Sequence, residues 1–235
     1  SCFSNGTVST EMYALSRRDS LPIAAALREV VGGGGLEACV VASVAGRYAD
    51  QELAAALHEA LGVEPAFYYS PDRQAGLSNC YAEPGRLGVD RWLAMVDAWH
   101  RVKAAAIVVD CGSALTIDLL DGAGQHQGGY IVPGLRMLES SLLDKTASVR
   151  FQGAQTWNSL DPGSSTVECV HNGTMSMTVA FITETVVALQ KRVQDTCPVF
   201  LTGGDAESVM AWLPEGMTHL PDMVLDGLER VTAGQ

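Results

Sequence analysis

Short apolar runs alternate with longer amphipathic stretches along most of this chain. The short runs are bounded by Gly, Pro or Asp, which is typical of buried strands, and the longer stretches carry apolar residues three and four positions apart, as core-facing helices do. The pattern predicts strands at residues 36–45, 65–70, 115–120, 127–132, 197–204 and 217–221, and a further strand that ends at Asp110. It predicts helices at residues 49–62, 88–104, 135–143, 165–193, 205–212 and 222–231, with residues 71–86 irregular.

The start of the chain predicts a hairpin followed by a helix. Asn5-Gly6 is a strong signal for a two-residue turn, so residues 1–4 should end one strand and residues 7–15 should form the next. Ser20 precedes a helix-like apolar stretch with Pro22 in its first turn, and the glycines at residues 32–35 end it.

The predicted elements fall into two halves with a similar order. Each half has a hairpin or meander, then a helix, a strand, a helix and a strand. We therefore predict an α/β protein with an N-terminal lobe at residues 1–104, which lacks its opening strand, and a C-terminal lobe at residues 105–235. The order of elements repeats, whereas the sequence does not. Two such lobes leave a cleft between them, which is a common place for a ligand.

The stretch after Asp110 is a turn of small residues followed by a second strand, because Thr116 and Asp118 alternate with apolar residues. A phosphate bound here would lie in a hairpin, not at a helix start as in P-loop and dinucleotide-binding folds. Asp110 is suited to hold a cation or its water shell. Taken alone, an ordinary Gly-Ser hairpin with a surface aspartate explains the stretch better.

Two further segments change this interpretation. Residues 128–134 and 201–206 also place glycines at predicted strand ends, where the backbone can approach a flat or charged ligand closely. Three such groups in one α/β half favour a nucleotide cleft.

Charge and cysteine content narrow the class of protein. The net charge of −12 argues against a nucleic-acid partner or an anionic membrane surface, both of which need clustered Lys and Arg. The six cysteines form no C-x-x-C pair, so we expect thiols in a reducing cytoplasm rather than zinc ligands or disulfides. No apolar run has the length of a membrane span, and no signal peptide is evident.

Four motifs resemble those of the type III pantothenate kinases, in the superfamily of acetate and sugar kinases, heat-shock chaperones and actin. They are Gly88-Val89-Asp90-Arg91, Asp110 to Asp118, Gly128 to Gly134 and Leu201 to Asp205. The resemblance covers roughly residues 81–235. It implies the actin-like ATPase fold with two ribonuclease-H-like lobes. It also implies ATP-dependent phosphorylation of pantothenate, the first step toward coenzyme A, with Mg²⁺, a monovalent cation (K⁺ or NH₄⁺) and a homodimer.

The resemblance also implies roles for individual residues. By position, Asp90 matches the proton acceptor of the family and Asp110 matches its ligand for the monovalent cation. Gly112 and Ser113 match the nucleotide contact, where the family usually has Thr in place of Ser113. The residues that match pantothenate contacts are Tyr81, Gly88, Val89, Asp90, Arg91 and Thr166.

Most of these residues have a structural alternative. Asp90 would suit the positive end of a helix dipole, and Arg91 is either a carboxylate anchor or a solvated helix residue. Tyr81 is either a substrate contact or a packing aromatic. Thr166 precedes a helix, so an N-cap competes with a pantothenate contact. Asp118 is either a second acid of the cleft or a surface residue.

The remaining candidates are read as structural. The five histidines lack the spacing of a metal site, so we expect them to be structural or at the surface. The helix at residues 165–193 carries a broad apolar face that includes Met177 and Val187, which predicts a homodimer across it, with the pantothenate site near the interface. The tryptophans and methionines at helical spacing fit helix packing.

One departure from the family is large. The family opens with an Asp-x-Gly-Asn-Thr-x-x-Lys loop around the nucleotide phosphates, and this chain begins at residues that would follow it. We expect a trimmed or misassigned start, because a sheet without its first strand would expose unpaired edges. The alternative is a catalytically impaired homologue that binds pantothenate or a partner as an accessory or regulatory factor. A sugar kinase or polyphosphate hydrolase is a third hypothesis, which the Gly-x-Asp-Arg motif argues against.

Overall fold

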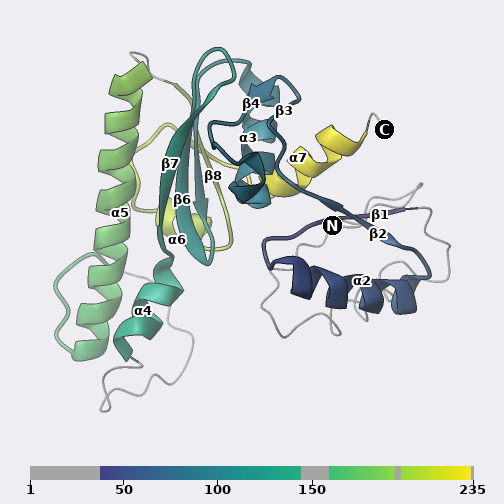
Figure 1. Cartoon of the computed structure of the whole chain (residues 1–235). Helices are drawn as coiled ribbons and strands as arrows, with labels where there is room; N and C mark the ends of the chain where they lie inside the picture. Colours follow the sequence, from purple (N-terminus) through teal and green to yellow (C-terminus); the bar gives the residue numbers. More distant parts are fainter. Residues whose placement is uncertain (1–37, 144–158, 194–196, 234–235) are drawn as a thin grey trace.

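The computed structural model describes residues 38–143, 159–193 and 197–233 (Figure 1). This part of the chain forms a five-stranded sheet with helices on both faces, a smaller unit of two strands and one helix, and a short hairpin. The hairpin and helix predicted before residue 36 lie outside the described residues and stay predictions.

The large sheet has the strand order β7-β6-β5-β8-β9. Its first three strands form an antiparallel meander, and β8 and β9 run parallel to β5 on the other side. The strands are β5 (Ala106–Cys111), β6 (Ala114–Leu120), β7 (His126–Pro133), β8 (Val199–Thr202) and β9 (Met217–His219). A meander joined to parallel strands is the arrangement expected of a ribonuclease-H-like lobe, so the predicted α/β class is confirmed.

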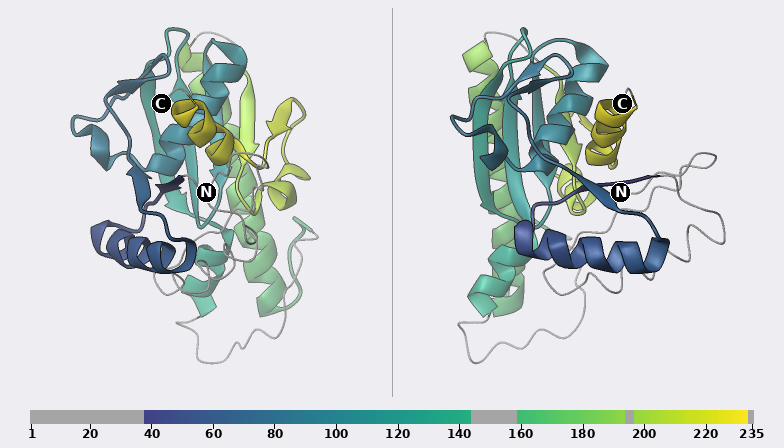
Figure 2. Two further views of the ribbon diagram at one scale, coloured as in Figure 1. Left: turned by 90° about the vertical axis from the view of Figure 1, so that its right-hand side faces the viewer. Right: turned by 45° about the vertical axis from the view of Figure 1, so that its right-hand side comes forward.

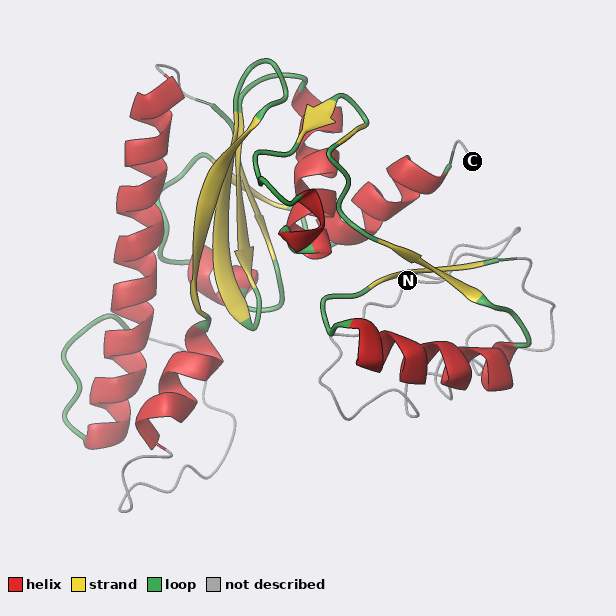
Figure 3. Cartoon of the chain, viewed as in Figure 1, coloured by secondary structure: helices red, strands yellow, loops and turns green. Residues whose placement is uncertain are grey.

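Alternate side chains of β5 face two separate cores. Ala106 and Val108 pack under α3 and α7, whereas Ile107 and Val109 pack under α5 and α6. This is the period of two that strand geometry imposes. The helices are α3 (Val89–Val102), α4 (Leu135–Leu143), α5 (Thr166–Val193), α6 (Ala206–Met210) and α7 (Met223–Thr232). Figure 3 shows them on the two sides of the sheet. Within the described ranges, no helix is both long and apolar enough to cross a membrane.

The smaller unit is a parallel strand pair with its connecting helix. β1 (Cys39–Ala42) pairs with β2 (Pro65–Tyr68), and α2 (Arg47–Leu61) makes the crossover that parallel strands need. α2 ends at Gly62, whose φ of 73° lies in the left-handed region that favours glycine. The unit has its own small core, which includes Leu53 and Leu57. Figure 2 shows the unit beside the large sheet.

Helix α3 contacts both units. The indole Nε1 of Trp92 donates a hydrogen bond to the Tyr68 hydroxyl of β2 over 3.1 Å. Near the other end of the helix, the fully buried Asp97 accepts from Arg101 Nε at 2.7 Å and from Arg230 Nε of α7 at 2.9 Å. Thus α3, which was predicted to belong to the N-terminal lobe at residues 1–104, packs in the core of the large sheet.

The predicted elements of the described residues are confirmed in type and order, but β8, β9 and α6 are shorter than predicted, and further differences occur elsewhere. The strand predicted at residues 36–45 is described only from Cys39 to Ala42. The irregular stretch contains two short paired strands, β3 (Arg73–Gln74) and β4 (Leu77–Ser78), and a 3-10 turn at Pro84–Arg86. β7 contains a bulge opposite Leu119, where Gly128 has a φ of 92°.

Gly227 brings α7 against the backbone of α3. An added Cβ would lie 2.7 Å from the carbonyl carbon of Leu93 and 3.1 Å from its Cα. We expect Gly227→Ala to push the two helices apart and to lower the free energy of unfolding by about 1–3 kcal/mol. Urea unfolding followed by circular dichroism measures this.

Gly173→Ala in α5 is the matched control, because an added Cβ there meets nothing within 4 Å. Alanine is the better helix former, so this variant should gain about 0.5–1 kcal/mol. Similar effects of the two substitutions would contradict a close contact between α3 and α7.

Candidate active site

The candidate site is built around the turn between β5 and β6. The Gly112 N–H donates to the carbonyl of Ala114 over 3.2 Å, and Ser113 is exposed at the tip. Gly134, just after β7, packs flat on this turn. Its N–H donates to the Ser113 carbonyl over 3.1 Å, and an added Cβ would lie 2.7 Å from the same oxygen. The predicted turn of small residues is therefore confirmed, and any larger residue at position 134 would displace it.

Gly203, which follows β8, packs on the same turn. It has a φ of 93°, and an added Cβ would collide with Asp110 Oδ1 and the Cys111 backbone. The Asp205 N–H donates to the Cys111 carbonyl over 2.9 Å. Two of the predicted glycine segments thus meet the strand tip through Gly134 and Gly203. The expectation that Gly128-Gly129 lies at a strand end is wrong, because both residues lie within β7.

Asp110 is the largely buried acid at this strand tip. Burial, together with the smaller effect of the charges of Asp90 and Asp118, raises the pKa of its carboxyl to about 7. Asp110 is therefore not the exposed hairpin aspartate of the structural alternative. Three carboxylates from α3, β5 and β6 lie within electrostatic reach of one another.

The Gly88–Arg91 motif forms the start of α3. Gly88 is the N-cap and Val89 is buried. Asp90 Oδ1 accepts a hydrogen bond from the backbone N–H of Arg91 over 2.7 Å, and an added Cβ on Gly88 would lie 2.6 Å from that oxygen. Asp90 thus has the position of a helix-start acid and also lies near Asp110, so its two predicted roles are compatible.

Arg91 is buried and paired with Asp118 of β6. Its Nε donates to Asp118 Oδ2 over 2.8 Å and its Nη2 donates to Oδ1 over 2.5 Å. Its Nη1 donates to the Tyr81 hydroxyl over 3.0 Å, and its guanidinium lies 5.9 Å from the centre of the Tyr81 ring. Burial would lower the pKa of Arg91, but the hydrogen bonds and charge of Asp118 raise it overall. The alternatives of a solvated Arg91 and a surface Asp118 are both wrong.

His126 extends this pair into a chain of polar contacts. It is 1% exposed, its Nε2 lies 2.9 Å from Asp118 Oδ1, and its Nδ1 lies 3.3 Å from the Cys80 sulfur. The Tyr81 ring stacks on its imidazole with the ring centres 6.1 Å apart. Tyr81 therefore packs on His126 and accepts a hydrogen bond from Arg91 at the same time. His126 was predicted to be structural or at the surface, and it is buried and structural.

Gly129 leaves space for the ion pair of Arg91 and Asp118. An added Cβ there would lie 3.0 Å from Arg91 Nη2 and would collide with Asp118 Oδ1. Gly129 lies directly opposite Asp118 in the ladder between β6 and β7. The glycine therefore serves this ion pair, not a nucleotide as its sequence position suggested.

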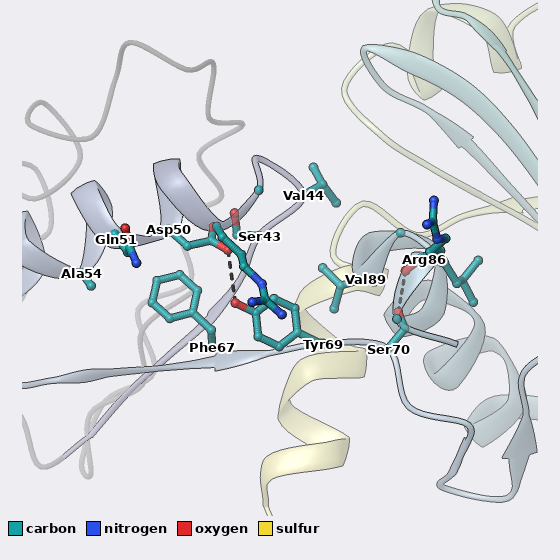
Figure 4. Close-up of a pocket in the computed structure, with 15 residues that line it drawn as sticks. Ser43, Val44, Asp50, Gln51, Ala54, Phe67, Tyr69, Ser70, Arg86 and Val89 are labelled. Atoms are coloured by element: carbon teal, nitrogen blue, oxygen red, sulfur yellow. Dashed lines mark hydrogen bonds between the residues drawn. The ribbon is translucent and has the colours of Figure 1, made fainter. Parts of the chain in front are cut away.

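A pocket of about 780 Å³ lies between the smaller unit and the start of α3 (Figure 4). Gly88 and Val89 line it from α3, and Asp50 and Tyr69 line it from the smaller unit. The Tyr69 hydroxyl donates to Asp50 Oδ2 over 3.2 Å. The pocket lies where the carboxyl ends of β1 and β2 meet the predicted pantothenate motif, which is a usual place for a ligand in parallel α/β units.

Thr166 lies apart from the other predicted substrate contacts. It is exposed in the first turn of α5, on the opposite side of the sheet from α3. Ser165 and Glu168 form a capping box before it: the Glu168 N–H donates to Ser165 Oγ over 3.2 Å, and the Ser165 N–H donates back to Glu168 Oε2 over 3.2 Å. The N-cap is therefore Ser165, and the N-cap alternative for Thr166 is wrong.

Asp110 is the predicted cation ligand of this site. Among the described residues, no three or more His, Cys, Asp or Glu side chains are grouped to hold a metal ion. A cation at Asp110 would be bound through that carboxylate. Such a charge would offset the burial that raises the pKa of Asp110.

Comparison with known proteins gives one family. A family model described as type III pantothenate kinase matches residues 4–188. The type III pantothenate kinase of Alcanivorax borkumensis is 51% identical over 195 residues, covering 83% of this chain and 78% of the relative. That of Pseudomonas aeruginosa strain PAO1 is 38% identical over 196 residues, covering 82% of this chain and 79% of the relative.

Likeness to solved structures is weak. The ethanolamine utilization protein EutJ of Carboxydothermus hydrogenoformans overlaps with a TM-score of 0.41 and 14% identity, covering 88% of this chain and 71% of that one. The assignment therefore depends on the sequence relatives and on the family model, which together span most of the chain. On these grounds the chain belongs to the type III pantothenate kinase family.

Proposed function

We propose that this protein transfers the γ-phosphoryl group of ATP to the hydroxyl of pantothenate, with Asp90 as the proton acceptor. The bond between the γ-phosphorus and the ADP oxygen breaks, a bond to the pantothenate oxygen forms, and the hydroxyl proton passes to the Asp90 carboxylate. The products are 4'-phosphopantothenate and ADP, the first step of coenzyme A synthesis. The names of the relatives favour this enzyme over an accessory factor without activity.

One observation carries the proposal. Asp90 lies in the first turn of α3 and Asp110 is the second-last residue of β5, and the fold brings them close enough for the charge of Asp90 to raise the pKa of Asp110. In phosphoryl transfer, an acid in this place can accept the proton of the attacking hydroxyl, and the glycine-walled turn can lie close to the phosphates. A weak base is sufficient, because positioning and charge compensation contribute more to this reaction than base strength does.

The turn at Gly112 and Ser113 is the proposed nucleotide contact. Ser113 is exposed, and the glycines at positions 134 and 203 leave the surrounding backbone uncovered by side chains. Mg²⁺ bound to the ATP phosphates would neutralise their charge. K⁺ or NH₄⁺ at Asp110 would do the same for the buried carboxylate.

The proposed pantothenate site begins at Gly88 and Val89, which line the pocket, and includes Tyr81, Asp90 and Arg91. The fork formed by Nε and Nη2 of Arg91 is already on Asp118, so a substrate carboxylate would meet the remaining N–H groups on Nη1 and Nη2. Thr166 lies on the other side of the sheet, and we assign its contact to a second copy of the chain.

A surface for that second copy extends over β7, α4 and α5. Its large apolar residues are between 40% and 60% exposed: Tyr130, Ile131, Met137, Leu142, Met177 and Val187. β7 is also an edge strand of the sheet. We propose a homodimer through this surface.

The free thiols of Cys80, Cys111 and Cys169 support the predicted cytoplasmic location.

Asp90→Asn tests the proposed reaction. Because the amide cannot accept the hydroxyl proton, we expect pantothenate-dependent ADP release to fall by about 10²- to 10⁴-fold with the fold intact. The control is Asp226→Asn on α7, which removes the charge of an exposed ion-pair partner of Arg101. This variant should keep normal turnover. A near-normal rate for Asp90→Asn would overturn the role of Asp90.

Asp110→Asn tests the cation site through stability. The raised pKa means that ionised Asp110 opposes folding, so this contribution is small below pH 4 and grows as pH rises toward 7 and above. In buffer without K⁺ or NH₄⁺, the variant should therefore be more stable than the unmodified chain at pH 8, by at most about 4 kcal/mol, and hardly different at pH 4.

Added K⁺ should raise the melting temperature of the unmodified chain at pH 8 and leave that of Asp110→Asn unchanged. Differential scanning fluorimetry with Na⁺ as the ionic-strength control measures both effects. Equal stabilisation of the two proteins by K⁺ would place the cation elsewhere.

Ile131→Asp tests the homodimer. A charge in the centre of the proposed interface should convert a dimer, with about twice the 24.9 kDa chain mass, into a monomer in light scattering. Tyr48→Asp is the control, since Tyr48 is 75% exposed on α2, away from this surface. A monomeric unmodified chain, or loss of the dimer in both variants, would contradict the proposal.

A further inference from the structure

Asp118 is the centre of a buried group of polar contacts next to the start of α3. Asp118 is 1% exposed, and it receives hydrogen bonds from Arg91 through both oxygens and lies 2.9 Å from His126 Nε2. The side chains of Arg91 and Asp118 are 4% and 2% exposed. A buried carboxylate with these partners is held in one orientation, because losing any partner would leave charge uncompensated away from water.

The histidine contributes a defined hydrogen bond. Asp118 Oδ1 accepts from Arg91 Nη2, and a proton on His126 Nε2 lets the imidazole donate to the same oxygen. With Nε2 protonated, neutral His126 can accept at Nδ1 from the Cys80 thiol, 3.3 Å away. Both ring nitrogens are then used, so the imidazole adds a second donor to the oxygen that accepts from Arg91 Nη2.

Holding Arg91 in place also affects Asp90, the residue before it. Arg91 follows Asp90 in the first turn of α3, and its backbone N–H donates to Asp90 Oδ1 over 2.7 Å. Fixing the Arg91 side chain to β6 therefore fixes the backbone group that orients the Asp90 carboxylate. It also aligns the remaining guanidinium N–H groups beside the Tyr81 hydroxyl.

We propose that Asp118, supported by His126, is a positioning residue that holds Arg91 and, through it, Asp90 in the geometry of phosphoryl transfer. Neither residue touches substrate. The proposal depends on the proposed function of this site. It gives Asp118 of β6 and His126 of β7 a role in supporting the Gly88–Arg91 motif at the start of α3.

Asp118→Asn removes the charge and one acceptor while keeping the shape. We expect the KM for pantothenate to rise about 10- to 100-fold and kcat to fall, because Arg91 loses its fixed orientation, whereas the KM for ATP should stay within about twofold. Steady-state ADP release with each substrate varied in turn measures the split.

Asp97→Asn is the matched control. Asp97 is another fully buried carboxylate of this core that is bonded to arginines, but it lies on α3 two turns beyond Asp90 and contacts Arg101 and Arg230. It should lower the melting temperature without changing the KM for pantothenate. If Asp118→Asn and Asp97→Asn lower the melting temperature to a similar extent and neither changes the KM for pantothenate or for ATP, Asp118 is only structural and the proposal is wrong.

Two substitutions of His126 separate its hydrogen bond from its volume. His126→Gln keeps a side-chain N–H that can reach Asp118, and His126→Leu does not. We expect the glutamine variant to stay close to the unmodified KM for pantothenate and the leucine variant to shift in the direction of Asp118→Asn. Equal constants for the two variants would remove His126 from the proposal.

An NMR measurement tests how Arg91 is held without depending on the proposed reaction. Arg91 held on Asp118 should give a slowly exchanging Nε–H resonance in ¹⁵N NMR, absent from Arg91→Lys and lost in Asp118→Asn. If the unmodified chain neither binds pantothenate by calorimetry nor releases ADP with it, the proposed function fails whatever the resonance shows. If it does both and the resonance survives in Asp118→Asn, the positioning role fails.

Discussion

Helix α3 is buried on nearly all sides, and this constraint determines most of the site. Its residues from Arg91 to Trp99 are all buried between the sheet, α7 and the segment before it. An apolar helix could accept such a place without further requirements, but α3 carries Arg91 and Asp97 inside it. Each needs a partner of opposite charge. Asp118 on β6 and the partly buried Arg230 on α7 supply those partners, so the helix has one rotation and one depth on the sheet.

That fixed placement explains why several glycines surround the site. Gly227 lets the backbone of α7 reach α3, Gly129 leaves room for the ion pair, and Gly134 and Gly203 let two loops lie on the β5–β6 turn. At all of these positions the missing Cβ would meet backbone or a buried charged group. The glycines of this lobe therefore serve close packing around the acids first, and any exposure of backbone to phosphate follows from that packing.

The sequence was informative where periodicity and turn chemistry act locally. The alternation after Asp110 correctly predicted a hairpin in place of a helix, and the start of α3 followed from its amphipathic pattern. The partner of Arg91 could not be derived in this way. Alternation places Asp118 on the same face as Thr116, but only the tertiary packing of α3 over β6 makes that face buried. The choice between a structural and a surface His126 stayed open for the same reason, since a bulge at Gly128, which no local pattern indicated, sets the register of its strand.

The path of the chain between the two units has a mechanical consequence. Among the described residues, the chain passes from β2 to α3 once, through residues 69–88. This segment is cross-linked by Ser70 Oγ, which donates to the Leu87 carbonyl over 2.9 Å, and by Asn79 Nδ2, which donates to the Pro71 and Pro84 carbonyls. Because α3 is fixed against α7 and β6, these hydrogen bonds tie the connecting segment to the start of a rigid helix. Ser70 and residues 85–88 of that segment line the pocket in Figure 4, so this wall of the pocket is held in place by the same packing that fixes α3.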